Sequence, residues 1–496
     1  MSAAIQFQRD HKTLTSDADN HPPASSFTKS DPGLPRANPT KAFWQEPAHP
    51  LCDVQSPSLP LSTDILIIGS GITGCSVTKH LLENSDYRVT VLEARSLCSG
   101  ATGRNGGHLT SAAPFEYLDL VAAFGNSMAM KVAKFTLLNV EKMYEIAKEI
   151  EESEVRLVDG VTGYFDAEAL RHSRRSLAAF ETDAPEFKGR HKTLDATELQ
   201  EQYGFHGTCG GIAGPAGALW PYRLVTRLYS LLVPQYSGRF SIETSTPAMD
   251  VIFDKDDQKY QVTTTRGVIK ATHVIHATNG YSGHLLPLLR GKIYPLRGTM
   301  TVQRCPPLFP KVGGTRSWST HHKPTYDPAT GRYSLGLYYM TQNETSGDIY
   351  LGGEDKKIDE ILTSDDTTAG DGFAVANLQS LPGTWFGEDI FPEHEQAARL
   401  KSSWSGIMGF TGDGLPLVGN LTPGLTGRHG PGEWIAAGFN GYGMVNCWMS
   451  GVAVANMVLG RDAENSAWFP EVYQVSEKRL NEGMNVETAF GDFFHL

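Results

Sequence analysis

Three glycines near the start of the chain have the spacing of a phosphate-binding turn. Gly69, Gly71 and Gly74 form a G-x-G-x-x-G run between a strand-like segment, residues 65–68, and a predicted helix over residues 72–84. The first glycine permits a sharp turn, the second lets a pyrophosphate approach the backbone, and the third lets helix and strand pack closely. The N-terminus of the helix then faces the negative charge. The predicted contacts of this turn are Gly69, Gly71, Ile72, Thr73 and Gly74.

An acidic residue follows the next predicted strand at the distance that a dinucleotide site requires. Glu93 ends the strand over residues 88–92 and comes 19 residues after Gly74. Its carboxylate can accept hydrogen bonds from both ribose hydroxyls of an adenosine and would repel a 2′-phosphate. Strand, turn, helix, strand and acid in this order predict a βαβ dinucleotide-binding unit; the alternative is a plain glycine-rich turn.

A second loop of small residues favours FAD over NAD as the dinucleotide. The sequence from Ser99 to His108 reads SGATGRNGGH. It can place backbone N–H groups and one guanidinium beside a diphosphate or a flavin edge, which a nicotinamide site does not need. His108 either touches the flavin ring or is only a packing residue. The predicted FAD contacts of this region are Glu93, Ala94, Arg95, Ala101, Thr102, Arg104, Asn105, Gly106, Gly107 and His108.

These residues resemble a known family. Glu93-Ala94-Arg95 followed by the ATGRNGG loop is similar to the D-amino-acid oxidase-like superfamily of FAD-dependent oxidoreductases, and within it to the glycine/sarcosine oxidase and γ-glutamylputrescine oxidase branch. Trp44 is typical of the latter. The resemblance covers about residues 40–460. It implies an α/β fold of the glutathione-reductase-like kind, in which a Rossmann-type FAD-binding domain is interleaved with a mixed-sheet substrate domain.

Further motifs follow in the order that the family shows. They are residues 217–225 (GALWPYRLV), 246–248 (TPA), 277–281 (ATNGY), 295–298 (PLRG), 404–406 (WSG), 411–416 (TGDGLP) and 438–444 (GFNGYGM). By this resemblance the FAD contacts extend to Ala248, Ala277, Thr278, Asn279, Asp413, Gly438, Asn440, Gly441, Tyr442, Gly443 and Met444.

The chain departs from the family at two places. The monomeric sarcosine oxidases have a flavin-linking cysteine where this chain has Gly406, and no cysteine lies between Trp404 and Asp413, so attachment by that route is excluded. Met340 follows Tyr338-Tyr339 where the putrescine-conjugate branch has an arginine. We therefore expect a substrate without the acidic group that such an arginine would hold.

Aromatic residues gather in the segment between two flavin-contacting motifs. We predict that Tyr294, Arg297, Trp318, Tyr338 and Tyr339 cover one face of the isoalloxazine, at least two of them at the ring or the cavity before it. An apolar wall there would keep an amine deprotonated. A sheet core would give the same pattern, and Arg297 is as well suited to fixing a turn as to holding a carboxylate. His321 and His322 lie in a predicted loop, where solvated histidines are commoner than metal ligands, so no metal site is predicted.

The remaining pattern divides the chain into an arm, two interleaved domains and a tail. Residues 1–60 are rich in proline and predict an extended arm, anchored at Phe43 and Trp44. The expected ranges are 61–160, 210–290 and 400–470 for the FAD-binding domain, 161–209 and 291–399 for the substrate domain, and 471–496 for the tail. Periodicity predicts helices over 127–152 and 445–459, and strands at 251–253, 260–265, 268–270, 273–277, 294–303 and 333–352.

Composition limits the partners and the compartment. The 496 residues carry a formal net charge of −12 from scattered acids, which argues for a small-molecule substrate and against nucleic acid or an anionic membrane. No apolar run approaches the roughly 20 residues that span a bilayer. Six widely spaced cysteines without a C-x-x-C pair favour a reducing compartment. We expect the cytosol, with the peroxisome as the alternative because residues 494–496 (FHL) loosely resemble its signal.

The expected chemistry is oxidation of the carbon–nitrogen bond of an amine or amino acid. Hydride would pass from the carbon next to nitrogen to flavin N5, giving an imine, and O₂ would be reduced to H₂O₂. Backbone N–H groups at residues 441–444 would stabilise negative charge on the flavin. Three alternatives stay open: a dehydrogenase with another electron acceptor, a tailoring oxidase of a larger amine-bearing metabolite, and a flavin-binding subunit without turnover. Oligomeric state is not predicted.

Overall fold

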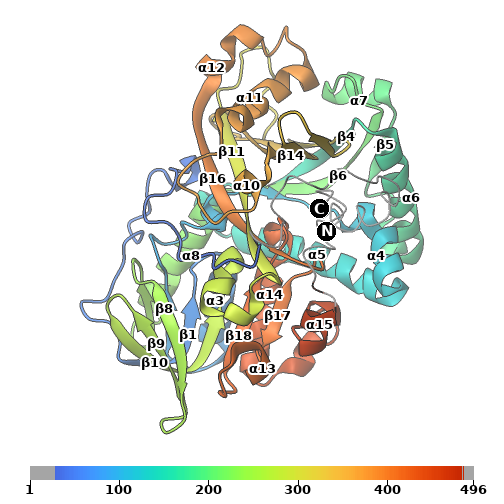
Figure 1. Ribbon diagram of the computed structural model, residues 1–496. Helices are drawn as coiled ribbons and strands as arrows, with labels where there is room; N and C mark the ends of the chain where they lie inside the picture. The colour runs from blue at the N-terminus through green and yellow to red at the C-terminus, as the bar shows by residue number, and fades with distance from the viewer. Residues whose placement is uncertain (1–27, 483, 485–496) are drawn as a thin grey trace.

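The structure, a computed structural model, describes residues 28–482 and 484 and contains two large sheets (Figure 1). The first, the cofactor sheet, has the strand order β17-β18-β10-β1-β2-β7, with β9 paired to β10 and β8 to β9. Its strands are β1 (Ser62–Ile68), β2 (Val89–Leu92), β7 (Phe240–Glu243), β8 (Ala248–Asp254), β9 (Lys259–Thr264), β10 (Gly267–His276), β17 (Leu417–Asn420) and β18 (Glu433–Ala437).

The centre of the cofactor sheet is parallel and buried on both faces. β1 pairs in parallel with β10 on one side and with β2 on the other. Its residues 65–68 are all buried, as expected for a parallel strand covered on both faces. Helix α3 (Ile72–Asn84) follows β1 directly and packs against α14 (Cys447–Val458). The predicted βαβ unit and Rossmann-type fold are therefore confirmed.

The second sheet, the substrate sheet, is mixed. Its strand order is β16-β11-β15-β14-β12-β4-β6-β3, with β13 paired to β14 and β5 to β6. Its strands are β3 (His108–Leu109), β4 (Arg156–Tyr164), β5 (Lys192–Leu194), β6 (Gly210–Ala218), β11 (Ile293–Gln303), β12 (Arg316–His321), β13 (Thr325–Asp327), β14 (Arg332–Gln342), β15 (Ile349–Lys357) and β16 (Leu400–Thr411).

Strand pairing draws the domain boundaries differently from the predicted ranges. β6 and β16 lie in ranges assigned to the FAD-binding domain, and β4 crosses the expected boundary at residue 160, yet all three belong to the substrate sheet. β4 is held between β6 and β12, and β16 pairs with β11 along nearly its whole length. Such pairings between distant segments cannot be predicted from local sequence, because the alternation of polar and apolar residues in one strand does not identify the strand that pairs with it.

The helices surround the two sheets. α11 and α12 lie at the end of the substrate sheet away from α3 and α14 (Figure 1). α5 ends at Ala147, five residues before the predicted helix end, and residues 151–153 form a short 3₁₀ turn instead. The remaining helices are α4 (Tyr117–Phe124), α5 (Asn126–Ala147), α6 (Ala167–Asp183), α7 (Ala196–Tyr203), α8 (Pro221–Gln235), α9 (Ser282–Leu285), α10 (Ile358–Ile361), α11 (Gly372–Phe386), α12 (Gln396–Arg399), α13 (Pro423–Thr426) and α15 (Glu477–Glu482).

The two ends of the chain are described only in part. Of the predicted arm, residues 1–27 lie outside the described residues, as does the peroxisome-like ending at 494–496. Trp44, an expected anchor, is 4% exposed, and Phe43 is partly buried against the same core. Within the described part of the chain no helix has the length and apolar character needed to cross a membrane.

Candidate cofactor and substrate site

One continuous cavity of about 460 Å³ lies between the two sheets. At one end it is lined by the turn between β1 and α3, by the end of β2, and by the end of β10. At the other end its wall is the face of the substrate sheet formed by β4, β11, β12 and β14. The carboxyl ends of parallel strands therefore open onto the same space as a largely apolar wall.

The glycine turn is shaped so that no side chain fits on it. Gly69 has φ +111°, and a Cβ there would lie 2.5 Å from the carbonyl oxygen of Ala277 at the end of β10. A Cβ on Gly74 would collide with the carbonyl oxygen of Gly69. Gly71, the N-cap of α3, has Thr102 Oγ1 2.9 Å from its Cβ position. The turn thus presents bare backbone to the cavity at the N-terminus of α3, as a pyrophosphate site requires.

Glu93 stands at the cavity where the ribose acceptor was predicted. Its carboxylate accepts hydrogen bonds from the Ser70 backbone N–H (3.2 Å), the Ser70 hydroxyl (2.6 Å) and the Arg95 backbone N–H (3.0 Å). These bonds fix the half-buried carboxylate and tie the end of β2 to the glycine turn. The arrangement fits an acceptor for adenosine hydroxyls.

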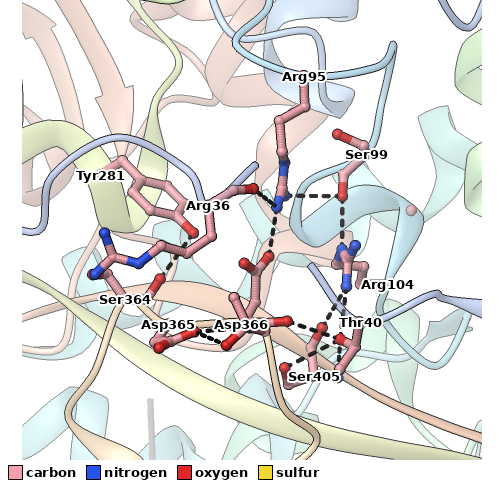
Figure 2. A network of polar contacts seen from close by, with 12 residues as sticks. Arg36, Thr40, Arg95, Ser99, Arg104, Tyr281, Ser364, Asp365, Asp366 and Ser405 are labelled. Carbon is pink, nitrogen blue, oxygen red and sulfur yellow. Dashed lines mark hydrogen bonds and ion pairs between the residues drawn. The ribbon is translucent and has the colours of Figure 1, made fainter. Parts of the chain in front are cut away.

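Two arginines, Arg95 before the second loop and Arg104 within it, are held beside the cavity by a polar network (Figure 2). The Arg95 guanidinium pairs with Asp366 at 2.8 Å, and both side chains are at least nine-tenths buried. Arg104 donates from Nε to the Ser99 carbonyl (2.7 Å) and from Nη1 to the Ser405 carbonyl (2.8 Å). Burial lowers the pKa of Arg104 to about 10, so it stays cationic at neutral pH. Asp366 neutralises Arg95, whereas Arg104 bonds only neutral oxygens and keeps a positive charge that suits a diphosphate.

The loop at residues 438–444 meets the second loop across the cavity. Asn105 Nδ2 contacts Met444 Sδ at 3.4 Å, and Asn139 Nδ2 donates to the Met444 carbonyl at 2.9 Å. Asn440, at φ +51°, accepts a hydrogen bond from the Thr411 N–H at 2.8 Å. The loop is thereby fixed to β16 and α5, and its residues 439–444 line the cavity.

The structure places most of the predicted FAD contacts on this cavity. They are Gly69, Gly71, Ile72, Thr73, Glu93, Ala94, Arg95, Ala101, Thr102, Arg104, Asn105, Gly106, His108, Ala248, Ala277, Thr278, Asn279, Asn440, Gly441, Tyr442, Gly443 and Met444.

Four predicted FAD contacts do not line the cavity. Gly74 packs α3 against the turn, and Gly107 and Gly438, both at positive φ, lie against Leu219 and Thr411 respectively. Asp413 is paired with Arg479 of α15 at 2.7 Å, so its carboxylate fastens the C-terminal helix. In each case neighbouring residues line the cavity, while the residue itself contacts other parts of the protein.

Alternate residues of the substrate sheet form the other wall. Ser319 and His321 of β12, Leu335, Leu337 and Tyr339 of β14, and Thr162 of β4 line the cavity. Register brings them side by side, because Ser319 is opposite both Tyr339 and Thr162. Successive side chains of a strand point to opposite faces, so the residues between them enter the core. Apolar side chains complete this wall: Leu296, Met300, Ile407, Met408, Phe410 and Phe115.

Of the five residues predicted to cover the isoalloxazine, only Tyr339 lines the cavity. Trp318 and Tyr338 point to the other face of the sheet and join a core cluster with Trp385 and Phe386, and Tyr294 lies in another core cluster. Arg297 pairs with Glu360 at 2.6 Å and donates to the Asp365 carbonyl. We predicted at least two of the five residues at the cavity, and the structure places one there. The predicted segments do border the cavity, but the sequence did not show which face of each strand meets it.

His321 is a lining residue that the sequence analysis set aside. It lies at the end of β12 rather than in a loop, with its ring stacked on Tyr164 at 5.0 Å, and burial lowers its pKa to about 4. His108 also lines the cavity; its Nε2 lies 2.9 Å from Ser317 Oγ, and burial lowers its pKa to about 4 as well. Both imidazoles are neutral at physiological pH. Residues 319–321 read Ser-Thr-His, and such a run of polar residues carries no alternation that would have marked His321.

Among the described residues no group of histidine, cysteine or carboxylate side chains could hold a metal ion. The same part of the chain fits FAD: a bare glycine turn at a helix N-terminus, a fixed carboxylate for ribose, the Arg104 cation for the diphosphate, and a largely apolar continuation for a flavin ring.

Comparison with known proteins agrees with this assignment. The family model described as FAD dependent oxidoreductase matches residues 64–457. A probable oxidoreductase OrdL of Rhizobium meliloti is 22% identical over 441 residues, covering 85% of this chain and 91% of the relative. The γ-glutamylputrescine oxidoreductase of Escherichia coli is 25% identical over 256 residues, covering 49% and 55%.

Solved structures show the same fold. Glycine oxidase from Geobacillus kaustophilus superposes with a TM-score of 0.63 at 18% identity, covering 84% of this chain and 99% of that one. L-Proline dehydrogenase from P. horikoshii gives a TM-score of 0.61 at 18% identity, covering 84% and 97%.

Proposed function

Because the chain belongs to the family of FAD-dependent oxidoreductases, with FAD as its cofactor, we propose that it oxidises the carbon–nitrogen bond of a small-molecule amine or amino acid. The observation that carries the proposal is the continuity of the cavity, which joins the dinucleotide turn to the apolar face of the substrate sheet. A substrate seated against that face lies beside the flavin end of the site. A neutral amine is favoured over a charged substrate group because the wall is largely apolar and the imidazoles of His108 and His321 are neutral.

The wall selects the reactive form of the substrate. An amine must be unprotonated to release a hydride from the neighbouring carbon, and transfer from water to an apolar wall disfavours the ammonium form. Leu337 and Met300 add apolar surface at this end, while the Tyr339 hydroxyl contacts Met300 Sδ at 3.2 Å. Bound FAD supplies the hydride acceptor. Loss of the hydride leaves an iminium ion, which releases its N–H proton to give the imine. Water then hydrolyses the imine to a carbonyl compound and a free amine.

His321 is the residue that we assign to the amine nitrogen. Its ring is fixed by stacking on Tyr164, and a neutral imidazole accepts one hydrogen bond. An amine N–H donated to it would leave the nitrogen lone pair free to assist hydride release. The backbone of residues 441–444 lies across the cavity and is the candidate donor to negative charge that develops on the flavin.

The decisive experiment is anaerobic bleaching of the purified yellow protein by matched pairs of compounds. Phenethylamine against phenylalanine, and N-methylphenethylamine against N-methylphenylalanine, differ only in the carboxylate. Because Arg297 is occupied by Glu360, we expect the amines to reduce the flavin faster. A full-FAD protein bleached by no amine or amino acid of a broad panel would refute the proposal and favour a flavin-binding subunit without turnover.

Oxidase activity is the second part of the proposal. We expect the bleached protein to regain its colour in air and to form one H₂O₂ per amine consumed. Slow recovery in air with fast recovery on an artificial acceptor would identify a dehydrogenase instead, and turnover restricted to larger amine-bearing metabolites would identify a tailoring oxidase.

All six cysteines are free, which supports a reducing compartment such as the cytosol.

A further inference from the structure

We propose that residues 31–45, here called the strap, form part of the FAD site: they close its adenosine end and limit the rate at which FAD leaves. The strap precedes residues 64–457, the part of the chain that the family model matches. Three observations carry the inference: the strap lines the cavity, it is fastened through polar contacts to both cavity arginines, and its end is anchored in the core.

The strap begins with a fixed turn on the cofactor-sheet side. The Asp31 carboxylate accepts hydrogen bonds from Arg290 (2.7 Å) and from the Gly33 N–H (2.8 Å), and pairs with His284 at 3.1 Å. The Pro32 carbonyl accepts a hydrogen bond from the Ser364 hydroxyl at 2.6 Å. These contacts set the position from which the chain crosses the cavity.

The next three residues are part of the cavity wall. Gly33, Leu34 and Pro35 line it together with Tyr281, His284, Leu285, Thr246 and Ala248. Glu93 lines the same end, where the ribose acceptor places the adenosine. Because the strap supplies this wall, a bound dinucleotide is enclosed there by chain outside the βαβ unit.

The middle of the strap is fastened at Thr40 (Figure 2). The Thr40 N–H donates to the Asp366 carbonyl at 2.7 Å, and its hydroxyl accepts from the Ser405 N–H at 3.0 Å and from Arg104 at 3.2 Å. The Asp366 carboxylate is 1% exposed and holds Arg95, which also donates to the Arg36 carbonyl at 3.3 Å. The strap, both cavity arginines and β16 therefore share one network.

The end of the strap is anchored by an aromatic side chain. Trp44 stacks on Tyr350 of β15 with ring centroids 3.9 Å apart and meets Trp220 edge-on at 4.9 Å. Its indole N–H donates to the Asn105 carbonyl in the second FAD loop, and Gln45 donates to the Ser99 and Gly103 carbonyls at 3.2 Å. The anchor combines aromatic packing with hydrogen bonds, whereas the contacts at Asp31 and Thr40 are polar, so the segment between Asp31 and Thr40 is the part suited to open.

Release of FAD tests the proposal without any substrate. Thr40→Val removes the hydroxyl contacts at nearly constant volume, and Asp366→Asn removes the charge opposite Arg95. We expect FAD to leave about fivefold faster from either variant, because a lost buried hydrogen bond of about 1 kcal/mol corresponds to roughly fivefold in a rate. Release is measured as the gain in flavin fluorescence after dilution. The control is Thr182→Val, whose exposed hydroxyl bonds only the Ala178 carbonyl on α6.

Trypsin reports the position of the strap directly. Arg36 and Lys41 are exposed on it, and cleavage after either requires the surrounding backbone to leave its contacts. We expect cleavage there to be fast in the FAD-free protein and slow in the loaded one, and faster in loaded Thr40→Val than in wild type. Unchanged release rates in both variants, or cleavage that is indifferent to FAD, would overturn the proposal, as would equal acceleration in Thr182→Val.

Discussion

Replacement of Gly69 by alanine is the sharpest test of the dinucleotide site. Two independent penalties act at this position. Its φ of +111° is a conformation that L side chains rarely adopt, and an added Cβ would lie 2.5 Å from the Ala277 carbonyl oxygen. The turn is fixed by the hydrogen bond from the Gly69 N–H to the Leu92 carbonyl at 2.8 Å, and the Ala277 carbonyl directly follows the central strand β10. The strain must therefore be relieved by displacement of the turn itself.

The size of the effect follows from these penalties. A strained backbone conformation costs about 1–3 kcal/mol, and an overpacked contact costs a further 1–3 kcal/mol. If half of the sum falls on the bound state, FAD affinity drops by about 1–3 kcal/mol, or roughly 5- to 150-fold. Titration of the FAD-free protein with FAD, followed by flavin fluorescence, measures this loss of affinity. A thermal melt of the FAD-free variant measures the part of the strain that destabilises the fold itself.

Gly100 provides the matched control for this substitution. It also lines the cavity, but its φ is −79° and nothing lies within 4 Å of its Cβ position. We expect Gly100→Ala to bind FAD as wild type does. Wild-type affinity in Gly69→Ala, or equal weakening in Gly100→Ala, would show that the glycine turn is not the phosphate site.

Three further outcomes are expected. Tyr339→Leu should slow anaerobic flavin reduction by amines about tenfold, whereas Tyr338→Leu should lower the melting temperature and leave the reduction rate unchanged, since only Tyr339 lines the cavity; equal effects on reduction would contradict the assignment. Burial opposes ionisation of Glu433, but hydrogen bonds from His276 and Arg428 outweigh it and lower its pKa to about 2. Its stabilisation, about 3 kcal/mol above pH 5, should disappear as the pH falls from about 4.5 to 2, and unfolding of wild type and Glu433→Gln by urea across that range would show it. Burial raises the pKa of the cavity thiol Cys447 to about 12, so we expect no covalent bond between this thiol and FAD; a flavin-labelled peptide containing Cys447 after proteolysis would contradict this.

The sequence alone determined the cofactor half of this protein. The G-x-G-x-x-G turn, Glu93 and the loop after it lie within some forty consecutive residues, and each has a local requirement: a positive φ, a helix N-terminus, a strand end. Such requirements are written in residue types at fixed spacings, because the atoms that meet the phosphate are close along the chain. FAD use and the Rossmann-type fold follow from them.

Only the tertiary structure decided the substrate half. Tyr338 and Tyr339 are neighbours of the same type, yet one enters a core and the other faces the cavity, because register with β12 and β15 fixes the orientation of the whole strand. The pairing of β12 with β14 brings His321 from a predicted loop to the cavity, and the packing of α10 against β11 pairs Arg297 with Glu360. The position of the strap also depends on tertiary structure. Thr40 and Asp366 are 326 positions apart, and no sequence pattern in either segment predicts their contact.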